Sequence, residues 1–210
     1  MTKTKLTAII TATLAATVLL TGCTQPAPKP THSTATHTAT PTAAPTQAQV
    51  EPPSSTDAAY AAANKTIDGF FATDAAISAA PEKGADAMAK FATGTALANE
   101  QSIAAQLAEK KWYVTGPASS WTPNPSLSSY GEVKNNTTGT VYNNAIAYMK
   151  GCLDLSGRIT RARAGATAKP SDSPDKMRPL AITVQWTPNT RTWLVTDLTS
   201  VTGTSGVPQC

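Results

Sequence analysis

The stretch 24–56 is the feature that most limits how this chain can fold. Its composition is dominated by Thr, Pro, Ala and Gln, and large apolar side chains are almost absent. Such a segment cannot bury enough surface to offset the entropy lost on ordering. We therefore predict a disordered, partly polyproline-like tether with a contour length of roughly 100 Å. The folded structure is then expected from 57–210, which is long enough for one domain with its own core.

The N-terminus has the pattern of a secretory signal. Lys3 and Lys5 make its start positive, and 6–20 is apolar but too short and too rich in Thr to span a bilayer stably. Leu20-Thr21-Gly22-Cys23 then resembles the lipobox of bacterial lipoproteins. The resemblance implies lipid transfer to the Cys23 sulfur, cleavage before that residue, and anchoring by acyl chains. The alternative is an ordinary secretory signal.

These patterns predict three parts: a lipoprotein signal peptide at 1–22, a lipidated Cys23 with its tether at 23–56, and a domain at 57–210. The predicted location is the outer face of the cell membrane. The membrane itself is then the first predicted partner, through the lipid anchor.

Both histidines, His32 and His37, fall in the predicted tether, where their spacing makes no metal site without a scaffold and more ligands. The predicted domain contains no histidine. This excludes Ser-His-Asp and Cys-His catalysis within one chain, and also histidine-ligated zinc. We assign no catalytic residue, metal or cofactor. Any enzyme chemistry would have to use carboxylates, Lys, Tyr or a bound cofactor.

Two cysteines remain once Cys23 is assigned to lipid. Cys152 and Cys210 would lie outside the membrane in an oxidising compartment, where a disulfide between them is the simplest interpretation. It would close a long loop and contribute roughly 4 kcal/mol in the chain-entropy model. The alternative, two free redox-active thiols, lacks a Cys-x-x-Cys spacing.

The charge distribution argues against nucleic-acid binding. The chain has 17 Lys and Arg against 13 Asp and Glu, and Lys3, Lys5 and Lys29 all precede the predicted domain. The domain is therefore only weakly basic, and no nucleic-acid partner is predicted. One local basic cluster could meet anionic lipid head groups or cell-wall polymers, although a solvated strand and loop is the ordinary interpretation. The cluster consists of Arg158, Arg161, Arg163 and Lys169.

Helical periodicity occupies the first third of the domain. Ser55 or Thr56 can cap a first helix with apolar residues at three- and four-residue spacing. A second short helix is expected between Pro81 and Gly94, and Thr95 can cap a third. The apolar positions in these three helices are Tyr60, Ala63, Ile67, Phe70 and Phe71; Ala85, Met88 and Phe91; and Ile103 and Leu107.

Strand patterns follow the helices. Runs of aromatic and β-branched residues bounded by Gly, Pro and Asn predict antiparallel strands at 111–115, 139–155, 158–164, 180–187 and 192–201. The last two form the clearest hairpin, because Ile182, Val184 and Trp186 alternate with less apolar residues and Pro188-Asn189-Thr190 turns the chain. Helices followed by a curved antiparallel sheet predict an α+β fold.

Several short motifs carry a family resemblance. They are Tyr60 with Ile67-Asp68 in the helical start, Gly151-Cys152-Leu153-Asp154-Leu155-Ser156 at a strand end, and Trp186 with Trp193-Leu194-Val195 in the hairpin. They resemble secreted actinobacterial lipoproteins with a nuclear transport factor 2-like, or cystatin-like, cone domain. The resemblance covers about 57–210 and implies a bent sheet that wraps a long N-terminal helix and leaves a conical pocket. Members use this pocket for catalysis, binding or assembly, so the fold does not determine the function.

Five residues are candidates for lining such a pocket: Tyr142, Tyr148, Trp186, Trp193 and Asp154. Strand alternation would place Tyr142, Tyr148 and Asp154 on one face of the long central strand. Most of the aromatic residues could instead belong to the core. Asp154, just before Ser156-Gly157, could instead organise a turn through bonds from its side chain to the backbone.

Three functions fit these observations. The first is a membrane-anchored protein that binds a small molecule or an envelope protein partner. The second is a cone-type lyase or isomerase, with Asp154, Asp68 or Tyr148 as the available groups. The third is a passive assembly module of an envelope complex. A binder predicts a closed pocket lined by aromatic residues, and an enzyme predicts a buried carboxylate at the pocket floor. An assembly module predicts a filled cone and an exposed apolar patch.

Overall fold

The computed structural model describes residues 49–171, 176–202 and 206–210. The predicted signal peptide, Cys23, both histidines and nearly all of the tether lie outside these residues. Within the described part, no helix has both the length and the apolar character needed to cross a membrane.

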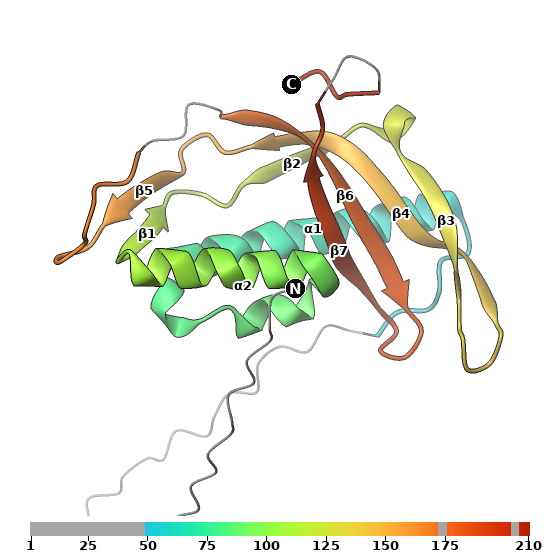
Figure 1. Cartoon of the computed structure of the whole chain (residues 1–210). Coiled ribbons are helices and arrows are strands. Elements are labelled where there is room, and N and C mark those ends of the chain that lie inside the picture. The colour runs from blue at the N-terminus through green and yellow to red at the C-terminus, as the bar shows by residue number, and fades with distance from the viewer. Residues whose placement is uncertain (1–48, 172–175, 203–205) are drawn as a thin grey trace, which may run out of the picture. The chain divides into compact units, whose positions relative to one another are not determined.

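Helix α1, Thr56–Ala79, is the long helix that the periodicity predicted (Figure 1). Ser55 is its N-cap, and the Ser55 side chain accepts a hydrogen bond from the Ala58 backbone N–H at 3.1 Å. One stripe of the helix is buried, with Ala63, Ile67 and Phe70 at most 1% exposed. Spacings of three and four residues place these side chains on one face, which packs under the sheet.

The chain after α1 differs from the prediction. Two short 3-10 helices, η1 Pro81–Lys83 and η2 Asp86–Lys90, replace the expected short α-helix. Gly84, with a φ of 78°, separates them and prevents a continuous helix.

Helix α2, Gly94–Glu109, confirms the third predicted helix, but the prediction that Thr95 caps it is wrong. Thr93 occupies the N-cap position, and the Thr95 hydroxyl instead lies 2.8 Å from the carbonyl oxygen of Thr196, to which it donates. The Thr95 hydroxyl, which the sequence pattern predicted to cap the helix, therefore bonds to the sheet instead.

Seven strands confirm the α+β fold. The five-stranded sheet consists of β2 Ser120–Pro123, β3 Ser129–Lys134, β4 Val141–Asp154, β6 Met177–Thr187 and β7 Thr192–Ser200, and a two-stranded sheet pairs β1 Trp112–Thr115 with β5 Ile159–Ala162. The strand order β2-β4-β6-β7 is antiparallel, and β3 pairs with the same edge of β4 as β2. A short 3-10 helix, η3 Pro125–Leu127, joins β2 to β3.

Strands β2 and β3 were not predicted from the sequence. Both are short, and each contains a residue that disfavours a strand, Pro123 in β2 and Gly131 in β3. Each pairs with a different half of the long β4, which supplies the partner that makes a short edge strand stable.

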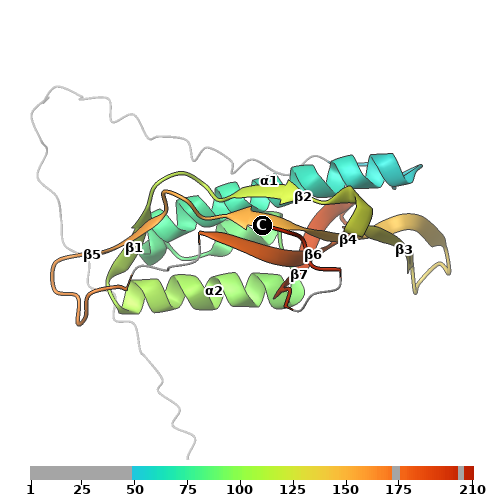
Figure 2. The same ribbon diagram turned by 90° about the horizontal axis from the view of Figure 1, so that it is seen from above.

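The five-stranded sheet arches over α1 and α2 (Figures 1 and 2). Buried apolar side chains fill its inner face. The register of β4 and β6 places Met149 opposite Ile182 and Ala147 opposite Val184. All four of these residues are at most 1% exposed. Together with the buried stripe of α1 they form the core, so helix and sheet meet in direct apolar contact.

The free edge of β7 is covered by the segment that leads into α2. The Val195 N–H donates to the Phe91 carbonyl at 2.8 Å, and the Thr93 N–H donates to the Val195 carbonyl at 2.9 Å. This short parallel bridge satisfies backbone groups that an edge strand would otherwise leave unpaired.

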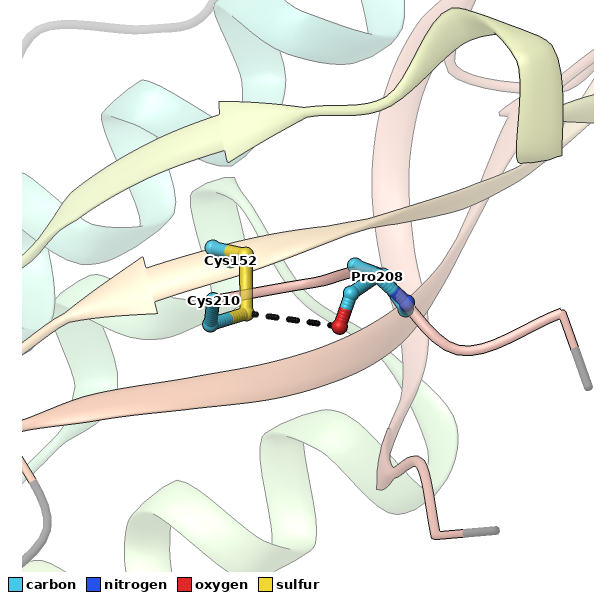
Figure 3. The surroundings of a disulfide bond; sticks show 3 residues. All are labelled: Cys152, Pro208 and Cys210. Carbon is cyan, nitrogen blue, oxygen red and sulfur yellow. Dashed lines mark hydrogen bonds between the residues drawn. A yellow bond between two sulfur atoms is a disulfide. The ribbon is translucent and has the colours of Figure 1, made fainter. Parts of the chain in front are cut away.

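The C-terminal segment is tied to β4 by the predicted disulfide. Cys152 and Cys210 are joined with a Cα–Cα distance of 5.6 Å and a sequence separation of 58 residues, which confirms this pairing (Figure 3). The Lys150 ammonium also donates to the Gly206 carbonyl at 3.1 Å. The neighbouring Pro208 is buried, so the end of the chain packs on the protein.

Replacing both bridge cysteines, as Cys152→Ser/Cys210→Ser, is expected to lower the free energy of unfolding by about 2–4 kcal/mol, because the unfolded chain loses a long cross-linked loop. Urea denaturation followed by tryptophan fluorescence measures this change. The reduced wild-type protein is the matched control and should show the same midpoint as the double variant. An oxidised wild-type protein that unfolds at that midpoint as well would mean that the bridge adds no stability.

Candidate functional site

The five residues predicted to line a pocket do not meet at one place. Trp186 and Trp193 are paired across β6 and β7 and are only 2% and 3% exposed, so both belong to the core. Tyr142 joins them, with its ring centroid 4.8 Å from that of Trp186. Tyr148 is 45% exposed, and Asp154 lies at the end of β4. Three of the five thus belong to the filled inner side, and two lie elsewhere.

A break in β4 explains why alternation failed for Tyr142. From residue 145 to residue 153 the odd-numbered side chains are buried and the even-numbered ones are partly or well exposed. Asn144 has a φ of 56°, a left-handed conformation that Asn tolerates better than most residues. Because this residue interrupts the extended backbone, Tyr142 contacts buried Trp186, whereas Tyr148 points to the outer face.

The groups considered as possible bases have structural or exposed positions. The Ser156 N–H donates to Asp154 Oδ1 at 2.7 Å, which confirms the interpretation of Asp154 as a turn residue. Hydrogen bonds from Ser156 lower the pKa of the Asp154 carboxyl. Asp68 is exposed on α1. Neither carboxylate lies at the floor of an enclosed cavity.

Two hollows occur on the surface of the described part. The larger, about 480 Å³, is bordered by Gln49, Lys90, Thr190 and Leu194, next to the point where the described chain begins. The smaller, about 180 Å³, is a groove between the C-terminal ends of α1 and α2 and the β1–β5 sheet. Within the residues that the structure describes, no group of three or more His, Cys, Asp or Glu residues could hold a metal ion.

A buried charged cluster, absent from the sequence predictions, joins four parts of the chain. The Arg158 guanidinium, just before β5, forms an ion pair with Asp74 on α1 and donates to the Ser119 hydroxyl at 2.7 Å. The Ser78 hydroxyl donates to the other oxygen of Asp74 at 3.0 Å. The Arg158 and Asp74 side chains are 13% and 14% exposed, so this pair is largely shielded from water.

Glu100 brings a second carboxylate from α2 to this cluster and is only 8% exposed. Burial, the neighbouring Asp74 carboxylate and a side-chain hydrogen bond with Asp74 raise the pKa of Glu100 to about 7, against the opposing effect of Arg158. Two carboxyl groups, those of Glu100 and Asp74, thus lie beside one guanidinium. This is the paired-carboxylate arrangement that the sequence did not reveal.

The cluster acts as a clasp in the fold. It fastens the β1–β5 sheet, through Arg158, to α1, and it brings α2 to the same point through Glu100. Neither surface hollow is lined by Asp74, Glu100 or Arg158. The sequence signal was weak, because these groups come from distant segments and only the Asp74–Ser78 spacing is local.

The predicted basic cluster is divided by the structure. Arg158 turns inward to the clasp, whereas Arg161, Arg163 and Lys169 remain exposed. Arg163 lies over the Tyr113 ring at 5.1 Å and pairs with Glu82 at 3.0 Å, on the rim of the smaller groove. Of the exposed part of the cluster, Arg163 therefore lines the groove, whereas Arg158 has a structural partner.

Comparisons with known proteins add little. No protein-family model matches the sequence, and no curated protein matches it. Among solved structures, the intermembrane-space region of the chloroplast protein ARC6 is similar with a TM-score of 0.39 and 10% identity, over 67% of this chain and 95% of that chain.

Replacing Glu100 by Gln is expected to change how stability depends on pH. The folded chain holds the Glu100 proton more tightly than the unfolded chain, so the wild-type free energy of unfolding should fall as pH rises from about 4.5 to about 7. The Gln side chain of the variant cannot ionise and still offers a neutral donor near Asp74. The Glu100→Gln variant should therefore show no fall in its free energy of unfolding over this pH range. It should match wild type near pH 4.5 and be more stable by roughly 1–3 kcal/mol at pH 8, as measured by urea denaturation.

Glu109→Gln is the matched control, since Glu109 is exposed at the end of α2 and the substitution changes the net charge equally. Its stability should follow the wild-type pH profile. Equal profiles for both variants would contradict a special role for Glu100.

Proposed function

We propose that the protein is a lipid-anchored extracytoplasmic protein whose domain binds a partner in the cell envelope through its outer surface. The observation that carries the proposal is the filled inner side of the sheet. Met149, Ile182 and Val184 are at most 1% exposed there and face the buried stripe of α1. A site of recognition on the surface fits this arrangement better than an enclosed pocket for a small molecule.

The covalent features support an extracytoplasmic location. The Cys152–Cys210 bridge is of the kind that persists in oxidising compartments. The sequence before Cys23 resembles a lipoprotein signal, and the Thr/Pro-rich segment after it suits a spacer. An anchored domain on a long spacer can meet partners at some distance from the bilayer.

Catalysis by a carboxylate is less well supported than binding. Asp74 and Glu100 are the best-placed acid pair in the described residues, but Arg158 and Ser78 already occupy the oxygens of Asp74. The pair lines neither of the two surface hollows described above.

Lipid anchoring at Cys23 predicts a clear difference in partitioning. Full-length wild-type protein, expressed in a bacterium that processes lipoproteins, should enter the detergent phase of a phase-separation assay. Cys23→Ser should stay in the aqueous phase, because the thiol that accepts the lipid is gone. Cys152→Ser/Cys210→Ser is the control and should partition like wild type. Wild-type protein in the aqueous phase would favour an ordinary secretory signal and overturn the anchor.

A filled interior predicts that the purified protein carries no small molecule. Native mass spectrometry of the exported Cys23→Ser chain should give the mass of the polypeptide alone with one disulfide, two mass units below the reduced chain. A stoichiometric small molecule that is released only on unfolding would overturn surface binding as the function and favour an internal site.

A further inference from the structure

The β1–β5 sheet and the segment that follows it form a basic projection at one end of the domain. We define the basic wing as residues 110–115 and 159–169, which include β1 and β5 (Figure 2). It contains five exposed cationic side chains, and the nearest described carboxylates are Glu82 and Glu109. The five are Lys110, Lys111, Arg161, Arg163 and Lys169.

Two of these cations are engaged with the protein itself. The Lys110 ammonium lies over the Trp112 ring, 4.8 Å from its centroid. Arg163 covers Tyr113, pairs with Glu82 and donates to the carbonyl of Ala79, the last residue of α1. Both also suit the negative ends of the helix dipoles, since α1 and α2 end here. Lys110 and Arg163, two of the five cations, therefore already have partners within the protein.

The other three cations have no ion-pair partner among the described residues. Lys111 lines the groove of about 180 Å³ beside Trp112. Arg161 is opposite Tyr113 in the β1–β5 register. Lys169 follows Ala168, whose carbonyl accepts the Trp112 indole N–H at 2.9 Å. Each of the three charges belongs to a segment that contacts Trp112 or Tyr113, and no ion pair among the described residues neutralises them.

We propose that the basic wing binds a linear, phosphate-bearing polymer of the cell envelope. Lys and Arg donors at Lys111, Arg161 and Lys169 suit successive phosphate groups, and the Trp112 ring in the groove suits the sugar or polyol between them. This inference rests on the proposed function in taking the domain to be extracytoplasmic and to bind through its surface.

A membrane surface fits the wing less well than a polymer. Stable binding at a bilayer interface uses apolar side chains that can insert between lipids. The Trp112 indole is held by Ala168, and Arg163 covers the Tyr113 ring, so neither is free to insert. Ile159 is the single large apolar side chain of the described wing that is well exposed.

The wing lies far along α1 from the start of the described chain. The described chain begins beside the β6–β7 turn, where the Val50 N–H donates to the Arg191 carbonyl at 2.7 Å, and it then enters α1 at Thr56. The wing contacts the other end of α1 at Ala79, about 36 Å along a helix of 24 residues. The basic side chains thus lie near the C-terminal end of α1, far along the helix from the point where the described chain begins.

The test measures binding of fluorescently labelled inorganic polyphosphate to the full Cys23→Ser chain at low salt. The Cys23→Ser chain with an unaltered wing should bind polyphosphate saturably, and its affinity should fall steeply as salt is added. Lys111→Glu/Arg161→Glu should weaken binding by at least about tenfold, because two phosphate contacts become repulsive. Lys65→Glu/Lys134→Glu is the control, since both lysines are exposed outside the wing and the change in net charge is the same.

The outcomes separate this inference from the proposed function. Equal loss of affinity in both double variants, or no binding by the parent chain, would overturn the wing as a polymer site. Sedimentation of the parent chain with phosphatidylglycerol vesicles, without polyphosphate binding, would overturn the polymer in favour of lipid. In each case, lipidation of the full-length wild-type protein at Cys23, measured by phase separation, would leave the proposed lipid-anchored location in place. If the glutamate variant fails to fold, Lys111→Gln/Arg161→Gln should still reduce affinity severalfold.

Discussion

Apolar packing between α1 and the inner face of β4 and β6 is the constraint on which the rest of this structure depends. Ile67 and Phe70 bring the helix stripe, and Met149 and Ile182 bring the sheet, with almost no exposure to solvent. Close packing of this kind leaves no room for a ligand, and it makes the sheet curve around the helix. The proposed recognition therefore uses the outside of the domain, where side chains that play no part in the core are exposed.

The outlying parts are attached to this core by polar and covalent contacts. Arg158 fastens the β1–β5 sheet to Asp74 on α1, and the Cys152–Cys210 bridge fastens the C-terminal segment to β4. The clasp includes a carboxyl group, Glu100, whose pKa of about 7 lies in the physiological range. An ion pair therefore attaches the β1–β5 sheet to α1, whereas a covalent bond attaches the C-terminal segment to β4.

Much of the fold could be predicted from local patterns, but the candidate sites could not. The long helix, the last hairpin and the disulfide follow from residue periodicity, turn residues and cysteine count. Strands β2 and β3 were missed, because they are short and their stability comes from β4. Tyr142 was misplaced by the left-handed Asn144, and Thr95 by its contact with Thr196. In each of these cases a tertiary contact or one backbone angle overrode the local preference.

Composition and periodicity by themselves determined that helices precede an antiparallel sheet, that the predicted domain lacks histidine, and that two cysteines are available for pairing. Only the tertiary structure decided which charged groups meet. Asp74, Glu100 and Arg158 are distant in the chain and become neighbours through the packing of α1, α2 and β5. It also divided one basic run between a buried clasp and an exposed surface. The physical reason is that the burial and pairing of a charge depend on what surrounds it in space, which spacing along one chain does not specify.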